Sequence, residues 1–256
     1  MTQREKLEIL AENPEERMLL AKILDRFTAA QRRDIPAFTG FLSLREQELV
    51  RRLMGQSGLQ FYGGYDQAER RIAAWLPDYL PEAEPPIACL RASYYPAEHP
   101  SHRDFLGSLM GMGIKREVLG DLCVSPGQCD LFLLAEMAPY VLQNFTSAGR
   151  TRLHVEEIAL SQAQVCPPET QRIHGTVSSL RLDSVLAVGF RISRGQAAQR
   201  IAAGAVAVDG AVCTKADRIL DEGVRISVRG LGKIRLCEIA GLTRKGRTGI
   251  ELERYI

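Results

Sequence analysis

The sequence predicts an α+β protein built from three successive parts. Three observations support this prediction. Helix-capping residues recur over residues 1–80, strand and helix patterns alternate over residues 81–165, and a helix pair followed by an Asp-Gly turn lies within residues 171–256. The chain has 256 residues, of which 45% are hydrophobic and 25% charged, and this composition is typical of a soluble globular protein with two or three domains.

Residues 1–80 are expected to be mostly helical. Asn13-Pro14-Glu15-Glu16 places a capping side chain, a proline and an acid in the positions that begin a helix. Ser43-x-x-Glu46 and Asp66-x-x-Glu69 repeat the capping pattern and predict two further helices. Because proline cannot continue a helix, the helical part is predicted to end at a cluster of prolines, namely Pro77, Pro81, Pro85 and Pro86.

Residues 81–165 follow the order strand, helix, strand, strand, helix, strand. The expected strands are 87–92, 118–124, 129–134 and 153–158, and the expected helices begin near Ser101 and Glu136. This order is typical of the ferredoxin-like fold, which the RNA-recognition motif (RRM) shares, and in which two helices cover one face of a four-stranded sheet. The sequence lacks the basic-glycine-aromatic motif that stacks bases in true recognition motifs, so the pattern predicts a shape rather than a function.

A linker that contains two prolines leads to a small α/β part, residues 171–256. The turn Asp209-Gly210 lies between two alternating apolar segments, which is the strongest short-range signal for a β-hairpin. Helices are expected at 180–188 and 193–204, and strands at 205–208, 211–214, 224–228 and 234–238.

The charge is divided unevenly along the chain. Residues 181–256 carry 14 Lys and Arg against 8 Asp and Glu, a net charge of +6, whereas the remaining residues carry 19 against 23, a net charge of −4. A basic module attached to a mildly acidic body is typical of a nucleic-acid-binding protein.

Arg194 lies in the first turn of the predicted second helix of this module, directly after its expected cap, Ser193. A cation there opposes the helix dipole at a cost of about 0.3 to 1 kcal/mol, and a bound phosphate would reverse that cost. Helix N–H groups and an arginine together suit an RNA backbone. The candidate RNA-binding residues are Arg181, Arg191, Ser193, Arg194, Gln196, Arg200, Lys215, Lys233, Arg244, Lys245 and Arg247. The alternative is a solvated face on which the arginines pair with Asp183, Asp217 and Asp221.

Residues 181–226 resemble the RNA-binding domain named for small-subunit ribosomal protein S-four. Arg181-Leu182-Asp183, Ser193-Arg194 and Val208-Asp209-Gly210 keep the order and spacing of that domain. The resemblance implies an RNA-binding helix pair, and for Arg181 and Arg194 it favours RNA contact over the ion-pair alternative.

Nearly the whole chain resembles the bacterial YlmH family. Phe61-Tyr62-Gly63-Gly64-Tyr65, His102-Arg103-Asp104-Phe105-Leu106-Gly107 and Gly113-Ile114-Lys115-Arg116-Glu117 carry this resemblance. It implies a ribosome-associated RNA-binding protein. Relatives of the S-four domain hold peptidyl-tRNA on the large ribosomal subunit during rescue of stalled synthesis, which implies rRNA or tRNA and that subunit as partners, and a quality-control role. Gly195 stands where such relatives carry a basic residue, which implies a weaker or differently arranged contact with RNA.

A second RNA-facing patch is expected on the central part. Its candidate residues are His102, Arg103, Lys115 and Arg116. The acidic residues among them leave an alternative open, which is an internal salt-bridge network with Asp104, Glu117 and Asp121.

No catalytic site, metal site or cofactor is expected. The six cysteines form no Cys-x-x-Cys pair, His99-x-x-His102 lacks further ligands, and no Gly-rich cofactor loop follows a strand. No apolar run reaches the roughly 18 to 20 residues that span a bilayer, and the N-terminus does not read as a signal peptide. We therefore expect a cytoplasmic, ribosome-associated protein without membrane insertion, and no DNA partner.

Two other functions compete with RNA binding. Arg181-Leu182-Asp183 resembles the catalytic stretch of pseudouridine synthases, but the 73 residues after Asp183 are too few for such a catalytic domain. An adaptor in cell division would use the acidic helical N-terminus to bind a division or quality-control protein. The expectation that best fits the sequence is a non-enzymatic protein that docks on ribosomal RNA or tRNA.

Overall fold

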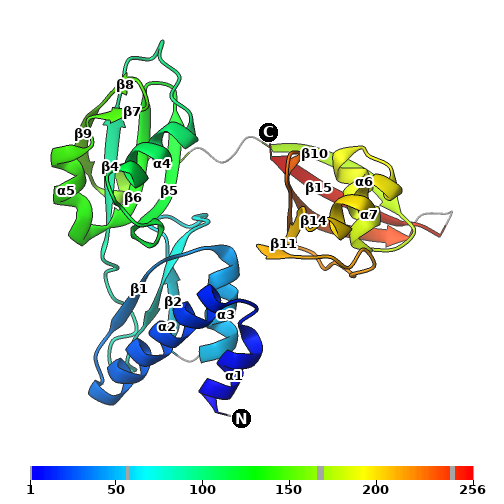
Figure 1. Ribbon diagram of the computed structural model, residues 1–256, viewed down its shortest axis with the longest axis horizontal. Helices are drawn as coiled ribbons and strands as arrows, with labels where there is room; N and C mark the ends of the chain where they lie inside the picture. Colours follow the sequence, from blue (N-terminus) through cyan, green and yellow to red (C-terminus); the bar gives the residue numbers. More distant parts are fainter. Residues whose placement is uncertain (1, 56–57, 166–169, 243–245, 256) are drawn as a thin grey trace. The chain divides into compact units, whose positions relative to one another are not determined.

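The structure is a computed structural model that describes residues 2–55, 58–165, 170–242 and 246–255 (Figure 1). The chain forms two compact units, Met1–Cys166 and Pro167–Ile256. Both units contain helices and strands, which confirms the predicted α+β class. None of the helices in the described ranges is long and apolar enough to span a membrane.

The first unit begins with helices that pack on a small antiparallel sheet of order β1-β3-β2. Its elements are α1 (Gln3–Leu10), α2 (Pro14–Arg33), β1 (Ala37–Leu42), α3 (Leu44–Met54), β2 (Leu59–Tyr62) and β3 (Arg71–Trp75). The first two predicted caps are confirmed. Asn13 Oδ1 accepts a hydrogen bond from the Glu16 N–H at 2.8 Å, and Ser43 forms a capping box with Glu46.

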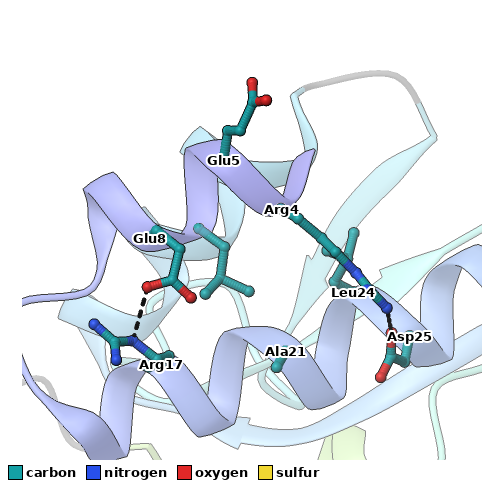
Figure 2. A pocket seen from close by; sticks show the side chains of 8 residues that line it. Arg4, Glu5, Glu8, Arg17, Ala21, Leu24 and Asp25 are labelled. Carbon is teal, nitrogen blue, oxygen red and sulfur yellow. Dashed lines mark ion pairs between the residues drawn. The ribbon is translucent and has the colours of Figure 1, made fainter. Parts of the chain in front are cut away.

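Helix α1 lies along α2 and leaves a pocket of about 450 Å³ between the two helices (Figure 2). Ion pairs border the pocket, with 3.1 Å between Arg17 and Glu8 and 4.0 Å between Arg4 and Asp25. Exposed pairs of this kind each contribute about 0 to 1 kcal/mol. Burial of apolar side chains, Leu7 of α1 among them, is therefore the main force that holds this short helix in place.

The prediction of a helix from Asp66 is wrong, and the expectation of a mostly helical region missed the β1-β3-β2 sheet. Residues 65–69 form a loop that leads into β3. The distant Asp121 carboxylate organises this loop, because it accepts hydrogen bonds from the Tyr65 hydroxyl at 2.8 Å, the Glu69 N–H at 2.7 Å and the Arg70 N–H at 3.1 Å. A contact between distant parts of the chain thus overrides a local capping signal.

The central part has the predicted ferredoxin-like arrangement. Its elements are β4 (Ile87–Ser93), α4 (His102–Gly111), η1 (Arg116–Val118), β5 (Leu119–Ser125), β6 (Gln128–Leu134), η2 (Ala135–Met137), α5 (Ala138–Asn144), the short hairpin β7 (Ser147–Ala148) and β8 (Thr151–Arg152), β9 (His154–Ile158) and η3 (Leu160–Gln162). The four-stranded sheet is antiparallel with the order β5-β6-β4-β9. Helices α4 and α5 bury Phe105, Leu109 and Val141 against one face of it.

The opposite face of this sheet is closed within the same unit. Phe132 of β6 packs with Phe41 of β1 and Ile72 of β3 in one buried cluster. Beside it the Arg91 guanidinium donates two hydrogen bonds of 2.8 Å to the buried carboxylate of Asp130. The Gln162 carbonyl accepts a further hydrogen bond from Arg91, and the Gln164 N–H donates one to the Asp130 carboxylate. The face that stacks bases in recognition motifs is thus occupied by the protein itself.

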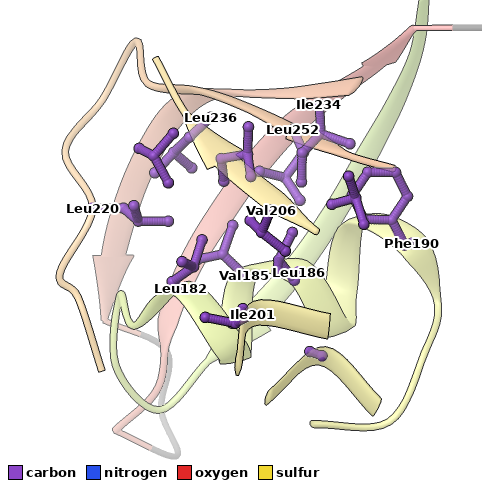
Figure 3. Close-up of a cluster of buried hydrophobic side chains, with 14 of the residues drawn as sticks. Leu182, Val185, Leu186, Phe190, Ile201, Val206, Leu220, Ile234, Leu236 and Leu252 are labelled. Atoms are coloured by element: carbon purple, nitrogen blue, oxygen red, sulfur yellow. The ribbon is translucent and has the colours of Figure 1, made fainter. Parts of the chain in front are cut away.

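The second unit is a six-stranded antiparallel sheet with α6 and α7 on one face. Its elements are β10 (Thr170–Val177), α6 (Leu182–Phe190), α7 (Arg194–Ala202), β11 (Val206–Val208), β12 (Ala211–Val212), β13 (Arg225–Val228), β14 (Gly232–Leu242) and β15 (Thr248–Tyr255). The strand order is β10-β15-β14-β13-β11-β12. Figure 3 shows the core between helices and sheet, in which Leu182, Leu186 and Ile201 meet Ile234 and Leu252.

The predicted hairpin is confirmed. Asp209 and Gly210 have φ angles of 49° and 82°, as a two-residue turn between twisted strands requires. Strands β10 and β15 were not predicted, although they pair with each other over eight residues each. Strand β14 is also longer than the predicted segment, 234–238.

Candidate nucleic-acid interface

The candidate interface lies where α6 and α7 begin. Arg181 is the cap residue of α6, and Arg194 is the first residue of α7. Between the helices the chain turns at Arg191, which adopts a left-handed conformation with φ of 53° and donates its N–H to the carbonyls of Ala187 and Val188. This short connection brings the start of α7 within reach of the first turn of α6.

Asp183, in the first turn of α6, joins the two arginines. Its carboxylate accepts hydrogen bonds from Arg194 Nη2 at 2.8 Å, and from Arg181 Nε at 3.2 Å and Nη2 at 3.4 Å. Burial disfavours the charged carboxylate, but the hydrogen bonds and charges of Arg181 and Arg194 outweigh it and lower the pKa of Asp183. The carboxylate is therefore ionised at neutral pH and fixes the positions of both guanidinium groups.

The two arginines keep donors for a ligand. The Asp183 side chain is only 8% exposed, whereas the Arg194 side chain is 53% exposed and the Arg181 side chain 37%. Each guanidinium carries five N–H donors, and a single carboxylate can satisfy only part of the ten. The ion-pair alternative is thus correct for Asp183, yet the pairing leaves one net positive charge and outward-facing donors at the surface.

Ser193 and Gln196 form the capping box of α7. The Ser193 hydroxyl accepts the Gln196 N–H at 3.1 Å, and Gln196 Oε1 accepts the Ser193 N–H at 2.9 Å. These bonds satisfy two of the N–H groups that a helix start leaves open. The first role of both side chains is therefore to begin the helix that carries Arg194.

The other predicted RNA-binding residues are spread over the second unit. Arg191 and Lys215 are exposed on loops, and Arg200 donates to the Arg229 carbonyl at 3.4 Å. Lys233 lies over the Tyr255 ring, on the sheet face away from the helices, because its neighbour Ile234 points into the core.

The last three predicted residues belong to the basic segment before β15. Arg247 donates to the Thr176 carbonyl at 2.6 Å. Arg244 and Lys245 lie outside the described residues. Of the predicted set, Arg181 and Arg194 are joined through a common partner, Asp183, and Ser193 and Gln196 are joined directly.

The predicted second patch lies at the starts of α4 and η1. His102, Arg103 and Lys115 are exposed, whereas Arg116 is half-buried and donates to the carbonyls of Leu119 and Gly120 at 3.3 Å. Partial burial and the nearby charge of Arg116 lower the pKa of His102.

The salt-bridge alternative for this patch is not realised as close ion pairs in the described ranges, although the charge of Asp121 acts on Arg116 and that of Arg103 on Asp104. No ion pair there joins its cations to the three neighbouring acids. Asp104 instead caps α4 through Ser101, and Asp121 binds the 65–70 loop.

Sequence reasoning missed Arg70, whose guanidinium lies against the second patch. It donates to the carbonyls of Leu119 at 2.8 Å, Phe41 at 2.8 Å and Arg116 at 3.0 Å. No local pattern marks this residue, because its partners are 29 to 49 positions away in the chain.

Comparisons with known proteins agree with the predicted family. Residues 94–162 match the family model described as "Putative RNA-binding domain in YlmH", and residues 180–226 match the S4 domain. The chain is 34% identical over 245 residues to the ribosome-associated protein quality control protein P2 of Bacillus subtilis (strain 168), a match that covers 94% of this chain and 95% of that protein.

Among solved structures, the cell division protein ylmH from Streptococcus pneumoniae is similar with a TM-score of 0.48 and 20% identity, covering 59% of this chain and 96% of that one. The two family models and the near full-length similarity to the Bacillus protein show that the chain belongs to the YlmH family.

Proposed function

We propose that this protein is a non-enzymatic RNA-binding protein that docks on ribosomal RNA or tRNA at the large ribosomal subunit, in quality control of stalled nascent chains. The observation that carries the proposal is the arginine pair at the helix pair of the S4 domain, the partly exposed Arg181 and the exposed Arg194, both held by Asp183. The name of the Bacillus relative supports the ribosome as the place of action.

The chemistry of the pair suits phosphate. Guanidinium groups bind phosphate oxygens through paired N–H donors, and they bind better when they are already held in place, because less side-chain entropy is lost. Asp183 supplies this restraint for Arg194 at 2.8 Å. The start of α7 adds the positive end of a helix dipole beside the arginine.

The mode of binding should be electrostatic and largely independent of base sequence. The net charge of +6 over residues 181–256 attracts the backbone, and the closed face of the central sheet offers no stacking platform. Affinity should therefore fall steeply with salt, with a slope of log K against log[salt] near −0.7 to −0.9 for each phosphate that is bound.

The test is binding of the full-length protein to large-subunit rRNA and to tRNA over a series of salt concentrations. Arg194→Ala should weaken binding by roughly 10- to 100-fold, as expected for one charged hydrogen-bonding group, and should make the salt slope shallower. The matched control is Arg172→Ala, which removes one cation from the sheet of the same unit, where it pairs with Glu251. Equal affinity and slope for wild type and Arg194→Ala, with a normal melting temperature, would refute this assignment.

A further inference from the structure

A cleft in the first unit gathers positive charge from three separate segments. It has a volume of about 530 Å³ and lies between α2, β1 and η1. Five cationic side chains line it, namely Lys22, Arg26, Arg70, Lys115 and Arg116. Of these, only Lys115 and Arg116 belong to the patch that the sequence predicts.

The fold brings these segments together by a close backbone contact. A Cβ atom on Gly40 of β1 would lie 2.7 Å from the carbonyl oxygen of Glu117 in η1, so only glycine permits this approach. Helix α2 borders the cleft with Lys22 and Arg26, which are exposed and four positions apart on one face, while Ile23 and Phe27 are buried.

Two arginines, Arg70 and Arg116, crowd together in the cleft. Arg70 and Arg116 both donate to the Leu119 carbonyl, and within the described parts of the chain neither forms an ion pair. Burial lowers the pKa of both groups, and the charge of Arg116 adds to this effect for Arg70. The carboxylates of Glu46, Asp121 and Glu69 act in the opposite direction, and the pKa of Arg70 falls to about 10. Both remain charged at neutral pH, so their repulsion is a cost that a bound anion would relieve.

The acids that line the cleft do not cancel this charge. Among the described lining residues, three carboxylates stand against the five cations, namely Glu46, Glu117 and Glu136. Glu46 is committed to the capping box of α3, where it accepts the Ser43 N–H at 2.6 Å. The lining residues thus keep a net positive charge, five cations against three carboxylates. Asp121 and Glu69, which do not line the cleft, also act on Arg70 and Arg116, so the exposed cations Lys22, Arg26 and Lys115 are the ones best placed to meet an anion.

We propose that this cleft binds the phosphate groups of an RNA backbone, as a second RNA contact that is separate from the S4 helix pair. The inference rests on the proposed RNA-binding function and adds a site to it. Its cations come from α2, the loop before β3 and the start of η1, which suits a run of phosphates better than a single anion. Because no base-stacking face is open beside it, the cleft should read the backbone and not the bases.

The experiment compares RNA affinity and salt slope for two double variants of the full chain. Lys22→Gln/Arg26→Gln removes the exposed cations of the cleft. The matched control, Arg32→Gln/Arg33→Gln, removes two exposed cations from the last turn of the same helix, away from the cleft. The probes are large-subunit rRNA and tRNA, and thermal melting checks that both variants fold.

The cleft variant should bind severalfold more weakly than the control, with a slope shallower by about 0.7 to 0.9 for each phosphate that it no longer binds. Equal affinity and slope for the two variants would overturn the cleft proposal. Unchanged RNA affinity combined with loss of ribosome co-sedimentation would also overturn it and would make the cleft a protein-docking site.

The outcome for the cleft is distinguishable from that for the S4 helix pair. If Arg181→Ala/Arg194→Ala binds like wild type while the cleft variant is impaired, the assignment to the helix pair fails and the cleft proposal holds. If the cleft variant binds like wild type while Arg181→Ala/Arg194→Ala is impaired, only the cleft proposal is overturned. A wild-type protein that binds neither probe at low salt would overturn both.

Discussion

Asp183 combines a positioning role with a stabilising one. Its nearly buried carboxylate is ionised because Arg181 and Arg194 donate to it. Removing a hydrogen-bonded charge from such a position leaves its partners with unmade bonds. The residue therefore contributes both to the geometry of the arginine pair and to the stability of the second unit.

Asp183→Asn should lower the free energy of unfolding by about 1 to 3 kcal/mol at pH 7. Folding lowers the pKa of Asp183, so the carboxylate stabilises the protein fully above its unfolded-state pKa of about 3.9 and loses this effect as pH falls through the folded-state value. Denaturant unfolding at pH 7 and pH 3 measures this, and the gap between wild type and variant should be smaller at pH 3 than at pH 7, because pH 3 lies below the unfolded-state pKa. A gap of the same size at both pH values would contradict the role of the charge.

Arg191 offers a way to separate stability from binding. A residue other than glycine in the left-handed region is strained, and glycine is preferred at this position after a helix. Arg191→Gly should therefore raise the free energy of unfolding by roughly 0.5 to 1 kcal/mol while it weakens RNA binding. Thermal melting and RNA titration on the same sample test both statements, and unchanged RNA affinity would remove Arg191 from the interface.

The candidate site was predictable from sequence only in part, for reasons visible at single residues. Arg181, Asp183 and Arg194 stand at the starts of two helices with strong local signals, so the pairing of both arginines with Asp183 could be foreseen. RNA contact stays a prediction for both arginines. The role of Arg70 could not be predicted, because its hydrogen bond to the Arg116 carbonyl joins positions 46 residues apart. The involvement of α2 in the same cleft has no local signature either.

Elements with strong local signals were also the ones predicted correctly. The Ser101 cap, the turn between β5 and β6, and the Asp209-Gly210 hairpin each depend on a few adjacent residues. Strands β10 and β15 were missed because each depends on the other, and residues 65–69 were misassigned because Asp121 controls them from another strand. Pairing between distant segments is what sequence patterns do not contain.

The contact between β1 and η1 gives a prediction at the level of elements. Gly40→Ala would place a methyl group 2.7 Å from the Glu117 carbonyl and force the two segments apart, at a cost of about 1 to 3 kcal/mol. Gly107→Ala in α4 is the control, because its Cβ would meet no atom within 4 Å, and it should stabilise the helix by roughly 0.5 to 1 kcal/mol. Denaturant unfolding would contradict this packing if Gly40→Ala were as stable as wild type.

Across the whole molecule, charge and cores are divided between the two units. The second unit carries the net positive charge, the S4 domain and a core of its own. In the first unit, the central sheet has one face under α4 and α5 and the other under the N-terminal strands. The molecule thus presents cations on helix starts and in a cleft, which suits a backbone-directed contact with folded RNA.

Ribosome co-sedimentation on a sucrose gradient tests the central claim most directly. Wild type and Arg181→Ala/Arg194→Ala are compared at low and moderate salt, with melting temperatures measured in parallel. Docking through the S4 helix pair predicts that wild type travels with the large subunit at low salt, that moderate salt weakens this association, and that the folded double variant stays near the top of the gradient. A double variant that travels with the large subunit as strongly as wild type, or a wild type that does not travel with it at low salt, would contradict docking through this helix pair.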